Sequence, residues 1–159
     1  MRFRPHRIAK NSNTFSNTDE RKMTEQEIFK KLVPLVREVT GCREEQVTMQ
    51  SGLMQDLGAE SVDLLDFSFL IEETFGITIE ADEFEQQARG QISTGVYEVN
   101  GRLTDEALEV LKKALPEVPA EHFKPGLKKI EIPGILNVAV FVHLIQSKLS
   151  AKSQGGKNA

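Results

Sequence analysis

The chain has 159 residues, of which 39% are hydrophobic and 28% charged, and its formal net charge is −4. This length suits one domain with its own core, and the sequence has no run of about 20 apolar residues that could span a bilayer. The single cysteine, Cys42, excludes a disulfide within the chain and argues against a thiolate metal site.

Charge is unevenly distributed along the chain. Residues 1–22 hold six Lys and Arg against two acidic residues, so the remainder holds 14 basic and 22 acidic residues. We expect this acidic part to repel nucleic acid and anionic membranes and to bind proteins that carry basic patches.

Residues 1–22 are polar and lack periodicity, so they are expected to form a disordered N-terminal extension. Their basic, acid-poor composition also fits an organelle transit peptide. Met23 directly precedes a helix-start signal, which favours a translation start at that residue and a cytoplasmic protein.

The first predicted helix begins with a capping box over Thr24–Glu27. Pro34 is expected to bend this helix, and Gly41 to end it. Its inward face is predicted from apolar residues at helical spacing: Ile28, Leu32, Leu35, Val36 and Val39.

Residues 42–60 are predicted to form a long ordered loop, followed by a second helix from Ser61 to Phe75 that stops at Gly76. This helix carries two apolar stripes, and a helix that is apolar on two faces is normally covered on both. One stripe is Val62, Leu65 and Phe69; the other is Leu64, Phe67, Ile71 and Phe75.

The rest of the chain is less regular. A small hairpin is predicted over residues 96–103 about an Asn-Gly turn, followed by a helix from Thr104 to Leu115. The last helix is expected from about Ile135 to Leu149, with a flexible tail over 151–159. The residues expected to face inward are Leu136, Val140, Leu144 and Ile145.

Residues 56–66 carry the chemical signal. They place Ser61 at the first position of a helix, directly after a glycine-containing turn, where its hydroxyl is exposed. The free amides of a first helical turn can meet a phosphate placed on that hydroxyl. Glu60 and Asp63 would oppose a free phosphate, whereas a site that is docked by a basic enzyme would tolerate them.

This segment resembles the phosphopantetheine attachment motif of acyl carrier proteins, which is usually Asp-Ser-Leu. The resemblance extends over residues 27–82 and resumes over 132–149. Glu60 and Val62 replace the usual Asp and Leu while keeping charge and apolarity. An insert over about 83–131 makes the chain similar to elongated, specialised bacterial members. The resemblance implies an all-α, up-down helical bundle over residues 23–150, with a long first loop and an irregular insert containing the hairpin and a helix.

The resemblance also implies the roles of individual residues. Ser61 would bear 4'-phosphopantetheine covalently. Partner enzymes would dock on Glu60, Val62, Asp63, Asp66, Phe69, Glu72 and Glu73. The acyl pocket would be lined by Leu65, Phe67, Ile71, Phe75, Val140 and Leu144. We expect the insert to pack beside the second helix and to reshape the pocket or the docking face.

The resemblance implies a carrier that catalyses nothing itself and is monomeric. Its partners would be a phosphopantetheinyl transferase and acyl-processing enzymes of the ketosynthase, dehydratase, reductase and acyltransferase types. Two alternatives stay open: a peptidyl or aminoacyl carrier, and an unmodified interaction module in which Ser61 only caps its helix.

No binding site is predicted at the histidines or at the paired lysines. His6, His122 and His143 lack metal-ligand spacing and are expected to be structural or at the surface. The basic pairs Lys112–Lys113 and Lys128–Lys129 are expected to be solvated.

Overall fold

The computed structural model of the chain describes residues 23–80, 83–92 and 95–158. Apart from one two-stranded hairpin, the elements of this part are helical, which confirms the predicted fold class. The disorder predicted for residues 1–22 lies outside the described residues. In the described part of the chain, no helix is both long and apolar enough to cross a membrane.

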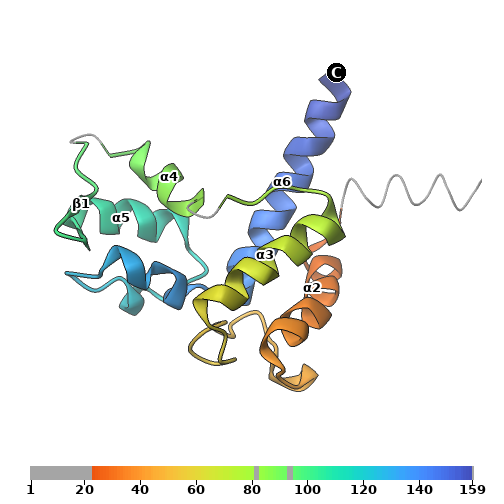
Figure 1. Cartoon of the computed structure of the whole chain (residues 1–159). Coiled ribbons are helices and arrows are strands. Elements are labelled where there is room, and N and C mark those ends of the chain that lie inside the picture. Colours follow the sequence, from red (N-terminus) through yellow and green to blue (C-terminus); the bar gives the residue numbers. More distant parts are fainter. Residues whose placement is uncertain (1–22, 81–82, 93–94, 159) are drawn as a thin grey trace, which may run out of the picture.

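Helices α2 (Glu25–Thr40), α3 (Ser61–Phe75) and α6 (Val138–Asn158) form a bundle (Figure 1). Helix α2 begins as predicted: the Glu27 amide donates to Thr24 Oγ1 over 3.1 Å, and the Thr24 amide donates to Glu27 Oε1 over 2.9 Å. It continues as one helix through Pro34 and ends at Gly41, whose φ of 76° favours glycine.

The bundle core forms where the apolar faces of these helices meet. Phe67 of α3 is fully buried, and its ring meets that of Phe141 of α6 edge to face, with centroids 5.1 Å apart and planes at 70°. Such an arrangement is favourable because the positive ring edge faces the negative ring face. The core side chains that α2 contributes are Ile28, Leu32 and Val36.

Helix α6 differs from its prediction at both ends. A 3-10 helix, η3 (Lys129–Ile135), precedes it, and α6 starts at Val138 because Asn137 supplies a cap. The Asn137 side chain accepts from the Val140 amide over 3.1 Å and donates to the Glu117 carbonyl over 3.0 Å.

At its other end, α6 runs to Asn158 rather than stopping at Leu149, so residues predicted as a flexible tail are helical. Within this extension, Lys152 Nζ donates to the carbonyl of Gly76, the residue that ends α3, over 2.7 Å. Figure 1 shows α6 projecting past the other helices of the bundle. No local pattern in the sequence predicts a contact between residues so far apart.

Residues 83–92 and 95–131 form what we call the insert lobe, on one side of the bundle (Figure 1). Helix α4 (Glu83–Arg89) packs against α5 (Asp105–Ala114), and η2 (Ala120–His122) follows. Strands β1 (Glu98–Val99) and β2 (Arg102–Leu103) form the predicted hairpin, with positive φ at its two turn residues, Asn100 and Gly101. Thr104 caps α5 by accepting from the Ala107 amide.

The insert lobe has an apolar interior that belongs to the same cluster of buried residues as the bundle core. It includes Tyr97, Leu103, Leu111 and Leu115, all buried. The guanidinium of Arg89 lies 4.4 Å from the centre of the Tyr97 ring. Burial and the nearby charge of Glu85 raise the pKa of the Tyr97 phenol well above its usual range. The insert, which contains the predicted hairpin and helix, is therefore folded.

Candidate functional site

The turn that precedes α3 is held by its own hydrogen bonds. The Gly52 amide donates to Asp56 Oδ2 over 2.7 Å, and the Ala59 amide donates to the Leu53 carbonyl over 2.9 Å. Gly58 has a φ of 80°, a conformation that glycine adopts without strain. These contacts fix the point at which the chain enters α3.

The same loop, which includes the 3-10 helix η1 (Glu44–Gln46), is fastened to the start of α6. The Leu53 amide donates to the Leu136 carbonyl over 3.2 Å, and the Val138 amide donates to the Ser51 carbonyl over 3.0 Å. The loop is therefore tied to two helices, so the position of Ser61 is set by the bundle rather than by the loop alone.

Ser61 is the first residue of α3, and it is exposed. Within the described residues, its hydroxyl makes no hydrogen bond to the protein. The preceding Glu60 amide donates to Asp63 Oδ2 over 2.8 Å, so Asp63 caps the helix and leaves the Ser61 hydroxyl open. This arrangement can accept a group covalently attached to that oxygen.

One apolar stripe of α3 faces outward. Val62 is 57% exposed, Leu65 55% and Phe69 64%, and we call these three residues the exposed stripe. Leu65 was predicted to line the acyl pocket, and that assignment is wrong for this structure. Its position three residues after Val62 and four before Phe69 puts it on the outer face with them.

The other stripe faces inward. Phe67, Ile71 and Phe75 are buried and belong to one core cluster with Val140 of α6. Leu144 is buried too, but it lies outside that cluster. Leu64 is partly buried against the core. The structure thus brings together four of the six residues expected to line the pocket.

The carboxylates of α3 divide into two sets. Glu60, Asp66 and Glu73 are exposed. Asp63 and Glu72 are half-buried and have internal partners, because Asp63 accepts from the Glu60 amide and Glu72 Oε2 accepts from the Ile79 amide over 2.9 Å. Glu72 therefore also fastens the segment that follows α3.

Two comparisons with known proteins decide the family. A family model described as "Phosphopantetheine attachment site" matches residues 30–89. An acyl carrier protein of Guillardia theta is 42% identical over 64 residues, which are 40% of this chain and 79% of that protein. The chain belongs to the acyl carrier protein family.

Other members of the family are similar over a comparable range. An acyl carrier protein of Petrotoga mobilis is 34% identical over 40% of this chain and 75% of its own length. The acyl carrier protein AcpXL of Rhizobium meliloti is 33% identical over 43% of this chain and 74% of its own length, in agreement with the expected specialised type. No solved structure matches the chain.

Acyl carrier proteins hold 4'-phosphopantetheine covalently and are carriers rather than catalysts. The group supplies a terminal thiol that holds an acyl chain as a thioester. The residues present fit it, because the exposed Ser61 hydroxyl is available and opens on a cleft. The family match continues to Arg89, so α4 lies within the matched range. The insert that was predicted to begin at about residue 83 therefore overlaps the family match over this helix.

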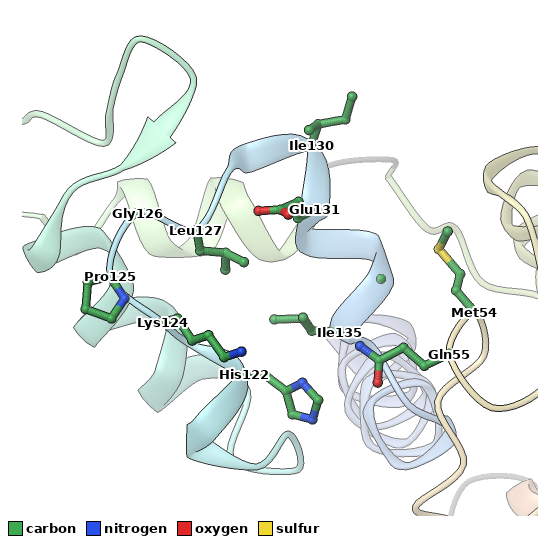
Figure 2. A pocket seen from close by; sticks show the side chains of 11 residues that line it. Met54, Gln55, His122, Lys124, Pro125, Gly126, Leu127, Ile130, Glu131 and Ile135 are labelled. Atoms are coloured by element: carbon green, nitrogen blue, oxygen red, sulfur yellow. The ribbon is translucent and has the colours of Figure 1, made fainter.

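Among the described residues, two clefts are lined by both the insert lobe and the acyl carrier bundle, and the sequence predicted neither. The first, of about 570 Å³, is shown in Figure 2: Met54 and Gln55 come from the loop before α3, while His122 and Lys124 lie on the opposite side. The second, of about 630 Å³, has Ser61 in its wall. Its other lining residues are Glu85, Glu98, Asn100, Gly101, Lys128, Lys129, Ile130 and Pro133.

Among the described residues, no group of three or more His, Cys, Asp or Glu side chains is placed to bind a metal ion. His143 of α6 is structural: its Nδ1 lies 2.5 Å from Glu117 Oε2 and its Nε2 lies 3.1 Å from Glu25 Oε2. His122 lines the cleft of Figure 2, and His6 lies outside the described residues.

Proposed function

We propose that Ser61 is the residue that bears the phosphopantetheine arm. The observation that carries the proposal is the exposed hydroxyl at the first position of α3, with its approach fixed by the Asp56 and Gly58 turn. A phosphopantetheinyl transferase with coenzyme A would form a phosphodiester bond at Ser61 Oγ. The hydroxyl proton would pass to a base of the transferase, and the nucleotide part of coenzyme A would leave.

Partner enzymes would dock on the outer face of α3. The exposed stripe gives an apolar centre, and Glu60, Asp66 and Glu73 surround it with exposed carboxylates. Such a surface steers basic partners at long range and then buries apolar area on contact. We propose the transferase and the ketosynthase, dehydratase, reductase and acyltransferase classes as those partners.

The acyl chain would enter the bundle between α3 and α6, among Phe67, Ile71, Phe75 and Val140, with Leu144 nearby. Because these residues are packed together, α3 and α6 must move apart to admit the chain. At about 0.8 kcal/mol per buried methylene, six methylenes contribute on the order of 5 kcal/mol before the cost of that movement. This supports reversible insertion rather than permanent burial.

The proposal is tested by intact-mass analysis of the full chain after incubation with coenzyme A and an active transferase. The expected gain is one phosphopantetheine, and it should vanish in Ser61→Ala. Ser68→Ala is the matched control, since Ser68 is a second serine of α3 and should leave the gain unchanged. A chain that stays unmodified would instead favour the interaction module.

The cargo is identified by the same measurement on protein purified from its own cell. An added mass that corresponds to a fatty acyl chain supports the acyl carrier, whereas the mass of an amino acid or peptide would indicate the peptidyl or aminoacyl carrier. A cytoplasmic location, a monomeric state and the absence of catalysis stay predictions.

A further inference from the structure

We propose that the cleft beside Ser61 receives the chain's own phosphopantetheine arm, and that Lys128 of the insert lobe pairs with its phosphate. The inference rests on the proposed attachment at Ser61. It assigns a role to the insert lobe, which would hold the arm against the protein between encounters with partner enzymes.

The location of Ser61 supports this occupant. Because Ser61 is part of the wall of the cleft, a group attached to its hydroxyl starts inside it. The volume of about 630 Å³ lies within the range of roughly 300–1,000 Å³ that is typical of small-molecule sites. A tethered ligand also has a high effective concentration, so weak contacts suffice to hold it.

The charges of the cleft single out one lysine. Lys129 Nζ lies 3.4 Å from Glu98 Oε1 and 3.9 Å from Glu85 Oε1, so its charge is already balanced by carboxylates. The neighbouring Lys128 is exposed, and its ammonium makes no ion pair within the described residues. Lys128 is therefore the cation available to a phosphodiester, which carries one negative charge.

The backbone at Lys128 is held in place before any ligand arrives. Its amide donates to Glu131 Oε1 over 2.8 Å, and the next amide, of Lys129, donates to the Gly101 carbonyl over 2.9 Å. Arg102 forms a β-bridge with Lys128. The hairpin thus fixes the backbone at the start of η3, so only the side chain of Lys128 has to be ordered on binding.

The apolar part of the arm has a partner in the same segment. Ile130 is 82% exposed and forms part of the wall. A single exposed isoleucine is common on protein surfaces, but this one stands two residues after Lys128. It can cover the methyl and methylene groups of pantetheine once the phosphate is held.

The test compares amide chemical shifts of the full chain by NMR before and after loading with the transferase and coenzyme A. Loading should shift the amides of residues 98–101 and 128–131 as well as those around Ser61. In Lys128→Gln these remote shifts should fall to less than half. Lys113→Gln is the matched control, because Lys113 is an exposed lysine of α5 that does not line the cleft.

The outcomes separate this inference from the proposed function. Intact mass reports loading on the same samples. If Ser61 is loaded but only residues near the start of α3 shift, or if Lys128→Gln leaves the remote shifts unchanged, the cleft does not hold the arm and the carrier function stands. If Ser61 is never loaded, both proposals are overturned.

Discussion

Phe67 and Phe69 stand two positions apart in α3 and lie in opposite environments. Phe67 is fully buried against Phe141, while Phe69 is 64% exposed on the outer face. Replacing each by alanine removes the same atoms from the same helix. The pair therefore separates the contribution of the core from that of the docking face.

The expected effects differ in size and in kind. Phe67→Ala leaves a cavity in a packed core and loses the edge-to-face contact, so it should lower the free energy of unfolding by about 3–5 kcal/mol. Phe69→Ala changes no buried contact and should alter the free energy of unfolding by less than about 0.5 kcal/mol. It should instead weaken partner docking, since apolar anchors dominate such interfaces.

Urea unfolding of the unloaded protein, followed by circular dichroism, measures the first quantity. The apparent KM of a transferase for the two variants, measured at a temperature where both are folded, gives the second. If Phe69→Ala destabilised the protein as much as Phe67→Ala, or left every partner's KM unchanged, the division of α3 into an inner and an outer face would be wrong.

Three further predictions follow from single contacts. Asp56→Ala removes the acceptor of the Gly52 amide and should cost about 1–3 kcal/mol in urea unfolding while slowing modification by the transferase; unchanged rates would refute the role of this turn. Lys152→Met should lower hydrogen-exchange protection in the last turns of α6 but not in α2, because the bond to the Gly76 carbonyl is lost. Tyr97 is the only tyrosine, and its raised pKa means that the folded state holds the phenolic proton more tightly. Stability from this group is thus complete below the unfolded pKa of about 10 and declines above it, so phenolate absorbance should appear together with unfolding; ionisation without loss of structure would contradict this.

The elements that the sequence predicted well are those whose signals are local. The capping box at Thr24, the glycines that end α2 and α3, and the Asn-Gly turn of the hairpin all act within a few residues. The boundaries of α3, and with them the place of Ser61 at a helix start, could therefore be set from the sequence.

The features that escaped prediction depend on contacts between distant segments. The start of α6 is set by Asn137, whose side chain reaches the Glu117 carbonyl, and its extension is linked to α3 through Lys152. The sequence showed two apolar stripes on α3 but not which of them faces outward, and Leu65 of the exposed stripe was therefore assigned to the pocket. The cleft beside Ser61 is lined by four separate segments, and nothing local in the sequence joins them; the pair Lys128–Lys129 was taken as solvated.

The way in which the insert lobe is joined to the bundle decides how its role can be tested. Glu117 belongs to the lobe, yet its carbonyl holds the Asn137 cap of α6 and its carboxylate holds His143. Deleting the lobe would therefore leave the side-chain amide of the buried cap residue Asn137 without its acceptor, so a change in cargo or partner preference could reflect a damaged bundle. Lys128 is involved in neither of these two contacts with the bundle. Point changes at the cleft thus separate control of the arm from docking on the exposed stripe, which the lobe leaves uncovered.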